Sequence, residues 1–502
     1  MRRVGLVLAW MCACAAAYAA ARPQAQAGNL TLQGSITHAQ NQSYVRVPFT
    51  VPAGVSRLTV AFHYTTQNLG TRIDLGVFDP HGFRGASGGN KSEFTISRTD
   101  ATPSYLPGPI DPGRWYLLLA VPNIRADVVA QYSVEISFVK VPGIEGFSAP
   151  LNDQPGWYRG DLHMHTGHSD GSCSSQTGKP VPCPVFVTVE TAVRRRLNFI
   201  AITDHNTVSQ YDALRELQPY FDALLFIPGR EITTFHGHAN VFGITPFLDY
   251  RVGTPAVPSI NTVAREVDRM GGLISINHPN APTGEICLGC GWHPDPPADL
   301  TLFGAIEAVN GGSLRGPYSG VSYWEHVLDE GYRITAIGGS DNHHGDWPIS
   351  HPDSVGIPTT VVYATRLSVP SVLDGIRAGH VFIDLTGSHD RMLVMTAAPA
   401  GRAAPLQMGD GVSLTAGQTL PLSIHIMGCP GWTLQLLDNG KADAEMPPAT
   451  LTAPEQSVHA TWHSDGKRHW ILPEVVNGEG ELEMLGNPIY VNFPPHPGKI
   501  LH

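Results

Sequence analysis

Positive charge is scarce in this sequence of 502 residues, which carries 32 Lys and Arg against 43 Asp and Glu for a formal net charge of -11. Beyond Arg194–Arg196, which falls on an expected helix, we find no run rich in Lys and Arg. Surfaces that bind nucleic acid need clustered basic side chains to contact phosphates. The sequence therefore argues against a nucleic-acid partner.

Long apolar runs are also few. Val4–Ala20 is apolar and rich in alanine, it follows Arg2 and Arg3, and small residues are frequent after it. This pattern is typical of an export signal, so we expect residues 1–27 to be removed and the mature protein to be periplasmic or secreted. An uncleaved membrane anchor is the alternative, but the run is short for a spanning helix. No later segment is long and apolar enough to cross a bilayer, so we expect no integral membrane segment after signal removal.

Cysteine is limited to seven residues, and two of them lie within the expected signal. In an oxidising compartment, Cys173 and Cys183 are expected to pair and to close a Pro-rich loop. Cys287 and Cys290 form either a second, local disulfide or half of a zinc site. We favour the disulfide because no second Cys pair completes a zinc site. Cys429 is left unpaired and is expected to be buried.

The chain divides into three parts by its pattern of apolar residues. Residues 28–141 alternate apolar and polar side chains between Gly- and Pro-bearing turns, which predicts an accessory β-sandwich, jelly-roll-like in form. After a Pro- and Gly-bearing linker, residues 155–385 alternate short apolar runs with amphipathic segments, which is typical of βα units around a parallel sheet or barrel. Residues 386–502 return to β-like alternation and predict a small C-terminal β domain. The expected fold is therefore multidomain.

Helices are expected in the middle part at four amphipathic stretches, Val187–Leu197, Asn261–Met270, Tyr323–Glu330 and Ser368–Ala378. The apolar runs expected as strands lie between several of them, with Leu224–Pro228 and Ala239–Gly243 among these. Each helix then connects two strands of a buried sheet.

The strongest local signal for chemistry is a pair of histidines separated by one residue, His163 and His165, with Asp170 shortly after. Residues two apart on a strand point to the same side, so these two imidazoles can hold one metal ion together. A lone His-x-His is weak evidence, because two surface histidines give the same pattern. The rest of the middle part decides the question.

Ionisable residues follow several other apolar runs at the point where each run ends. They are Asp204 and His205, Glu231 with His236 and His238, His278, and Asp341 with His343 and His344. The ends of parallel strands meet on one face of an α/β fold, so these side chains are expected to converge. Imidazoles mixed with carboxylates, without thiolates, favour zinc, manganese or iron over calcium. The sequence therefore predicts a site for two or three divalent metal ions, and Glu231 can bridge two of them.

These motifs, in this order over residues 155 to 385, resemble the PHP (polymerase and histidinol phosphatase) superfamily of metal-dependent hydrolases. The CehA/McbA branch, which includes carbaryl hydrolases, is the most similar. The resemblance implies a distorted (β/α)7 PHP-type barrel with three metal ions at the carboxyl ends of its strands. It also implies the chemistry of a hydrolase, with a metal-activated water attacking the substrate.

The resemblance further implies how the ligands are shared. The first ion is expected at His163, His165, Glu231 and Asp341. The second is expected at Glu231, His238 and His278, with His238 preferred over His236 because it opens an expected strand. The third is expected at Asp170, His205 and His343. Asp170 stands where many relatives have a histidine, so the third position is expected to be weaker or differently filled. Asp204 and His344 are expected to support the ligands or contact the substrate.

Four residues are candidates for catalytic roles. Asp341 is expected to orient or deprotonate the water, and His205 or His343 to protonate a leaving oxygen. Arg230 is expected either to clamp a phosphate or carbonyl oxygen or to form a structural ion pair. Asn280, His293 and Arg315 are further candidates for lining the pocket, on position alone.

The expected substrate is a small-molecule ester. A phosphoester is favoured by the resemblance, and a carbamate or carboxylic ester is the alternative on the same site. A phosphate monoester needs several cations beside the metals, and the loops offer few, with Lys179, Arg230, Arg251 and Arg315 the main candidates. The third hypothesis is that the protein is secreted, has no catalytic activity and binds metal or glycan. The oligomeric state does not follow from the sequence.

Overall fold

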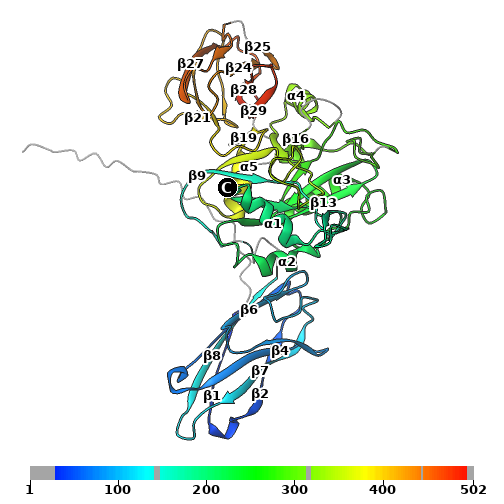
Figure 1. The fold of residues 1–502 in the computed structure, drawn as a ribbon, viewed down its shortest axis with the longest axis vertical. Helices are drawn as coiled ribbons and strands as arrows, with labels where there is room; N and C mark the ends of the chain where they lie inside the picture. The colour runs from blue at the N-terminus through cyan, green and yellow to red at the C-terminus, as the bar shows by residue number, and fades with distance from the viewer. Residues whose placement is uncertain are drawn as a thin grey trace, which may run out of the picture.

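The computed structural model describes residues 29–140, 147, 149–285, 287–312, 318–442 and 445–494. The expected signal at 1–27 and Arg315 lie outside these residues. Figure 1 shows a central part that carries the α-helices, with an all-β part at each end. Within the described residues, no helix is long and apolar enough to cross a membrane.

The N-terminal part consists of two four-stranded antiparallel sheets, ordered β1-β8-β3-β6 and β2-β7-β4-β5. The strands are β1 (Asn29–Ile36), β2 (Ser43–Val51), β3 (Arg57–Tyr64), β4 (Arg72–Phe78), β5 (Phe83–Ser87), β6 (Glu93–Ser97), β7 (Gly113–Asn123) and β8 (Ala130–Val139), with short 3-10 turns at His38–Gln40 and Gln67–Leu69. Alternate side chains of both sheets, such as Val60, Leu75 and Leu117, share one buried cluster. Two sheets that enclose one core form a β-sandwich.

The central part is a row of nine strands in the order β17-β16-β15-β14-β13-β12-β9-β18-β19. They are β9 (Gly156–Asp161), β12 (Phe199–Ile202), β13 (Leu225–Thr234), β14 (Gly237–Phe242), β15 (Leu273–Ile276), β16 (Ala305–Asn310), β17 (Thr335–Gly339), β18 (Thr359–Ala364) and β19 (Val381–Asp384). Strands such as β12 and β15 are buried along their whole length, which explains their continuous apolar sequence. A separate hairpin pairs β10 (Ser172–Ser174) with β11 (Pro180–Pro182).

Five α-helices and one 3-10 turn accompany these strands in the described residues. They are α1 (Val185–Arg194), α2 (Gln210–Leu217), α3 (Ile260–Arg269), α4 (Val321–Asp329), α5 (Val369–Ala378) and the turn Leu300–Leu302. The four stretches expected to be helical are confirmed to within a few residues, and α2 is additional. Ser368 caps α5 by accepting a hydrogen bond from the Ser371 N–H, and Gly379 ends it in a left-handed conformation.

The structure shows a sheet-rich fold in place of a regular seven-fold repeat of strand and helix. Strands β9, β12 and β13 are parallel neighbours, as are β15, β16 and β17. Between these sets β14 runs antiparallel to both its neighbours, because a tight turn at Gly237 (φ 130°) joins it directly to β13. The two ends of the row approach each other, since Gly338 on β17 exchanges two hydrogen bonds with the Thr360 hydroxyl on β18.

The C-terminal part is built on two largely antiparallel sheets. One has the order β21-β20-β23-β27, and the other continues the central sheet, because β19 pairs with β29. Its strands are β20 (Met392–Ala397), β21 (Leu406–Gln407), β22 (Gly411–Val412), β23 (Thr419–Met427), β24 (Thr433–Asp438), β25 (Lys441–Ala442), β26 (Ala449–Thr450), β27 (Glu455–His463), β28 (His469–Val476), β29 (Leu482–Gly486) and β30 (Ile489–Val491). The sheet therefore crosses the boundary that we placed after residue 385.

Candidate metal centre

The loops after β9 and β17 lie side by side and supply five of the expected ligands, which are His163, His165, Asp170, Asp341 and His343. The Asp341 N–H donates to the His163 carbonyl over 2.8 Å, and the His165 N–H donates to the Asn342 carbonyl over 2.9 Å. Asp341 is held at φ 49° and His278, after β15, at φ 25°. Left-handed backbone is unfavourable for these residue types and is concentrated at functional sites, where the surrounding structure holds it.

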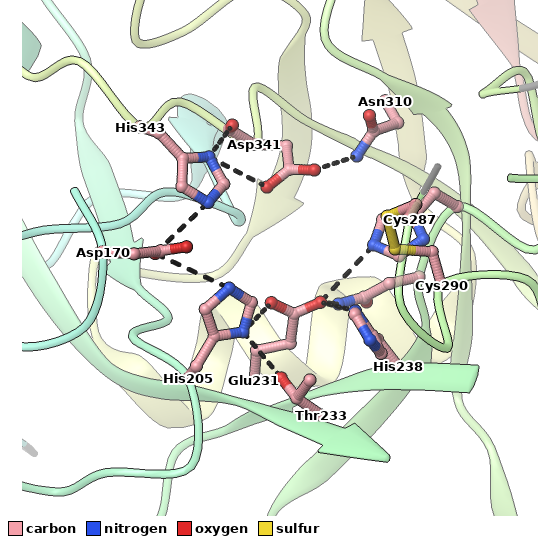
Figure 2. The surroundings of a disulfide bond; sticks show 12 residues. Asp170, His205, Glu231, Thr233, His238, Cys287, Cys290, Asn310, Asp341 and His343 are labelled. Carbon is pink, nitrogen blue, oxygen red and sulfur yellow. Dashed lines mark hydrogen bonds and ion pairs between the residues drawn. A yellow bond between two sulfur atoms is a disulfide. The ribbon is translucent and has the colours of Figure 1, made fainter. Parts of the chain in front are cut away.

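Glu231 lies within β13, which extends to Thr234 and not only to Pro228 as expected, because its second half pairs with β14. Its carboxylate lies within 3.5 Å of five imidazole rings, and Figure 2 shows the contacts with His205 and His238. Glu231 Oε2 is 3.4 Å from His163 Nε2, 3.5 Å from His165 Nε2 and 2.9 Å from His205 Nδ1. Glu231 Oε1 is 3.2 Å from His238 Nδ1 and 3.5 Å from His278 Nε2. Glu231 thus lies at the centre of the site.

Two aspartates complete the ring of side chains (Figure 2). Asp341 Oδ1 is 3.3 Å from His163 Nε2 and 3.1 Å from His165 Nε2. Figure 2 shows its contact with His343 Nδ1, at 3.7 Å. Asp170 Oδ1 is 3.4 Å from His343 Nε2, 3.7 Å from His205 Nε2 and 4.0 Å from His165 Nδ1. The structure therefore brings all nine expected ligands into one cluster.

Three groups of ligand atoms lie close enough to hold an ion each. They are His163, His165 and Asp341; His163, Glu231 and His278; and His165, Asp170, His205 and His343. His163 and His165 are each shared between two groups. His238 contacts Glu231 but belongs to none of the three groups, which departs from the expected second set.

Buried polar atoms without a hydrogen-bond partner test whether cations fit this cluster. Among the described residues, these atoms include His163 Nε2, His165 Nδ1, Glu231 Oε2, His238 Nε2 and His278 Nδ1. Unpartnered buried nitrogen and oxygen atoms are costly, and a bound cation satisfies them. The mixture of imidazole nitrogen and carboxylate oxygen suits zinc, manganese or iron. The residues fit a multinuclear metal centre.

The electrostatics of the cluster keep its carboxylates ionised. Burial alone would raise the pKa of Glu231, but the neighbouring His163, His205 and His238 outweigh it and hold this pKa well below its usual range. Burial likewise opposes the ionisation of Asp341, yet His163 and His165 lower its pKa well below the usual range. Deprotonated carboxylates are the form that binds a metal ion.

The histidines differ in charge. Burial lowers the pKa of His165 to about 4, so its imidazole is neutral and ready to bind a cation at neutral pH. Burial also acts against the charged form of His343, but its bond to Asp170 and the charge of Asp341 raise its pKa to about 9. A cation bound at His343 therefore replaces a proton.

Several supporting residues were not foreseen. Glu307 accepts from His163 Nδ1 over 2.9 Å, the Asn277 amide donates to Glu231 Oε1 over 2.9 Å, and the Thr233 hydroxyl is 2.6 Å from His205 Nδ1. Partners of this kind fix the ring orientation of a metal-binding histidine. The available signal was the charge of Glu307 inside the apolar run 305–309.

Asp204 and His344 hold loops in place. Asp204 accepts from the Thr166 N–H, the Thr166 hydroxyl and the Ser169 hydroxyl, each over 2.7 Å, and so fixes the turn that leads to Asp170. His344 Nδ1 is 2.9 Å from the Ser172 hydroxyl. Asp204 thus supports a ligand loop, and His344 also lines the pocket described below.

The structure corrects both expectations for Arg230: it has no ion-pair partner among the described residues, and its side chain does not face the ligand cluster. Its guanidinium is buried, donates to the Ile244 and Pro246 carbonyls, and lies over the Tyr211 ring. Neighbouring residues of a strand point to opposite faces. Since Glu231 faces the cluster, Arg230 points away from it.

The remaining candidates, which belong to none of the three ligand groups, are Asn280, His293 and His236. Asn280 donates to Ser319 and Ser322, and His293 pairs with the exposed His236 at a ring distance of 5.5 Å. None of these three is among the residues that line the pocket at the site.

Both expected disulfides are confirmed, with Cα–Cα distances of 4.7 Å for Cys173–Cys183 and 5.6 Å for Cys287–Cys290, and Cys429 is free and buried. Cys173–Cys183 joins the first strand of the hairpin that follows Asp170 to the residue directly after its second strand. Figure 2 shows the Cys287–Cys290 disulfide on the same side of the site as His238.

A pocket of about 340 Å³ opens beside the cluster. It is lined by Asn310, Gly311, Tyr318, Ser340, Asp341, Asn342, His343, His344, Trp347 and Asp353. The Trp347 ring stacks on His344, with 4.3 Å between ring centroids, and contacts the His351 ring in a tilted arrangement at 3.8 Å. No Lys or Arg is among these lining residues. A molecule in this pocket meets two of the expected ligands, Asp341 and His343.

No family model and no curated protein matches the sequence. Among solved structures, a two-domain protein from Bacteroides vulgatus, described as containing a predicted PHP-like metal-dependent phosphoesterase, is 20% identical, covers 70% of this chain and 96% of its own, and has a TM-score of 0.37.

Two smaller structures match less of the chain. The Yersinia pseudotuberculosis-derived mitogen is 15% identical over 22% of this chain and 86% of its own, with a TM-score of 0.15. The CARDB domain of a Pyrococcus furiosus protein is 12% identical over 20% of this chain and 97% of its own, with a TM-score of 0.13. Such TM-scores are too low to establish a shared fold, so the function is argued from the residues of the site.

Proposed function

We propose that the protein is a multi-metal-dependent hydrolase of the PHP type that acts on a small ester. The observation that carries this proposal is the cluster around Glu231, where His163 Nε2, His165 Nδ1 and Glu231 Oε2 are buried and have no hydrogen-bond partner among the described residues. Structural histidines in a core are satisfied by hydrogen bonds, whereas these atoms are left for a cation. When bound, divalent cations lower the pKa of water and neutralise charge on the group under attack.

The protein's own residues would then position the reactants. Asp341 and His343 line the pocket, so a substrate bound there lies against the cluster. The Asn310 amide donates to Asp341 Oδ2 over 3.2 Å, which leaves Asp341 Oδ1 directed at His163 and His165. A carboxylate held in this way is suited to orient a water or accept its proton.

The pocket lining favours a substrate with little negative charge on its reacting group. A phosphate monoester carries close to two negative charges at neutral pH and would need cationic side chains beside the metals. Asp341 and Asp353 line the pocket, whereas Arg230 points away and Arg251 is engaged by Asp249. We therefore propose a phosphodiester as the phosphoester substrate.

A carbamate or carboxylic ester is the second candidate. It is favoured by the same absence of basic residues among the described lining, together with the ring of Trp347 at the pocket wall. Hydrophobic and aromatic walls suit uncharged organic groups. The two candidates differ in charge and are separated by a substrate screen.

We also propose that the protein is exported to the periplasm or secreted. Its support is the apolar N-terminal sequence together with two disulfides, which persist in oxidising compartments.

The test is to purify the protein, measure its bound metals by elemental analysis, and assay chromogenic phosphomonoester, phosphodiester, carboxylic ester and carbamate substrates. Glu231→Gln and Asp341→Asn keep side-chain volume and should lose bound metal and turnover. Asp249→Asn changes a partly exposed carboxylate that pairs with Arg251, outside the cluster and the pocket lining, and is the matched control. Full turnover in a metal-free sample, or in Glu231→Gln, would refute the proposal and favour a different class of protein.

A further inference from the structure

Glu307 is a buried carboxylate in the middle of an apolar strand. It lies on β16 between Ile306 and Ala308, and it is 2% exposed. The pairing of β16 with β17 shifts register between Glu307 and Val309. Bulges of this kind re-aim a side chain and are frequent next to active sites. A buried charge of this type is retained only where strong partners satisfy it.

The partners of Glu307 belong to two of the three ligand groups. Glu307 Oε1 accepts from His163 Nδ1 over 2.9 Å. Glu307 Oε2 accepts from the His278 N–H over 3.0 Å and from the Asn310 amide over 3.1 Å. The same Asn310 nitrogen reaches Asp341 Oδ2 at 3.2 Å. One carboxylate and one amide therefore hold His163, His278 and Asp341 together.

The contact with Nδ1 sets the orientation of the His163 ring. Because an ionised carboxylate only accepts hydrogen bonds, the ring nitrogen that faces it carries a proton. The opposite nitrogen, Nε2, is directed at Glu231 Oε2 and Asp341 Oδ1, at 3.4 Å and 3.3 Å. In a neutral imidazole this leaves the Nε2 lone pair for a cation. Glu307 itself lies behind the ring, and none of the three ligand groups includes it.

The contact with the His278 N–H acts on the backbone. His278 is held at φ 25°, where a residue with a side chain is strained. A hydrogen bond from its N–H to a buried carboxylate is charge-assisted and therefore strong. Glu307 thus fixes the direction in which β15 delivers His278 to the site.

We propose that Glu307 is a positioning residue that sets metal affinity by orienting His163 and the His278 backbone, with Asn310 as the link to Asp341. This inference rests on the metal-binding part of the proposed function. It assigns to Glu307 no contact with the substrate and no direct bond to a metal ion. Its role is to hold three ligands from β9, β15 and β17 in one geometry.

The test compares zinc affinity among variants of the full protein, measured by competition with a chelator after the bound metal has been removed. Glu307→Ala removes all three contacts and should weaken zinc binding by about 10- to 100-fold. Glu307→Gln retains an oxygen that can accept from His163, so it should weaken zinc binding less than Glu307→Ala. It should still weaken binding to some extent, because its NH2 group cannot accept from the His278 N–H. Asn310→Ala should weaken binding, and its effect should not add to that of Glu307→Gln, since both act through one network.

Glu474→Gln on β28 is the matched control, because it changes another largely buried glutamate outside the ligand cluster and should leave zinc affinity unchanged. Parental zinc affinity in both Glu307 variants, or a loss no larger than that of Glu474→Gln, would overturn the inference. If Glu307→Ala does not fold, Glu307→Gln and Asn310→Ala decide the question. A parent protein that binds no zinc, manganese or iron would instead refute the proposed function.

Discussion

Replacing Gly339 with alanine should damage the metal centre through a steric conflict of a single methyl group. A Cβ built at this last residue of β17 would lie 2.4 Å from His163 Cβ and 2.6 Å from Glu307 Oε1. Carbon atoms in contact are normally about 3.5–4.0 Å apart, so His163 or β17 must move by about 1 Å. Overpacking of this kind typically costs about 1–3 kcal/mol.

The consequence for metal binding is larger than the consequence for folding. Ligand distances in metal sites must hold to within about 0.2 Å, so a displacement of His163 by about 1 Å is incompatible with binding. Gly339→Ala should therefore lose bound metal and turnover while the rest of the protein stays folded. The assay is elemental analysis of the purified variant, with a denaturation curve for its stability.

Gly338→Ala is the control from the neighbouring position. Its Cβ would lie 2.8 Å from Pro358 Cγ and 3.0 Å from Ile383 Cγ2, on the side away from the ligands. Both substitutions should lower stability, but only Gly339→Ala should lose metal. Equal metal content and equal turnover in the two variants would show that His163 is not held at this point and would refute the reasoning.

Three further outcomes follow. Asp170→Ala should remove one bound ion per protein and spare the others, because only one ligand group includes Asp170; metal counting would refute this if all ions were lost. Replacing Cys173 and Cys183 with serine should cost about 2–3 kcal/mol of loop entropy, and an unchanged midpoint in a denaturant titration would argue against it. Burial, and to a smaller extent the charge of Glu325, raises the pKa of Glu474 to about 7. Between pH 4.5 and 7 the folded state therefore holds a proton that the unfolded state has lost, and the free energy of unfolding falls as the pH rises. Glu474→Gln should make the free energy of unfolding less dependent on pH in this range.

The convergence of the site could be predicted from the sequence because it depends on strand ends, which short apolar runs mark clearly. His205, His278 and Asp341 each follow such a run, and parallel strands of one sheet bring their ends together. The structure places these side chains in one cluster, and metal binding itself stays a prediction.

Other features could not be predicted because they depend on direction and register. Arg230 and Glu231 are adjacent in sequence, and only the pleat of β13 decides which of them faces the cluster. The irregularity beside Glu307 has no sequence signature of its own. The antiparallel β14 replaces a strand–helix unit because Gly237 permits a tight turn, which the pattern of apolar residues does not reveal.

The three ligand groups are unequal in their access to solvent, and this determines where a substrate can approach. The side chains of His163, His165 and Glu231 are at most 1% exposed, whereas Asp170 is 59%, His343 34% and His205 25% exposed. The pocket opens at His343 and Asp341, on the side of the exposed group. Because a buried charge interacts more strongly than a solvated one, cations held by the buried groups should bind tightly and exchange slowly. The cation at Asp170 should exchange fastest, so gradual removal of metal should abolish turnover before the buried sites are emptied.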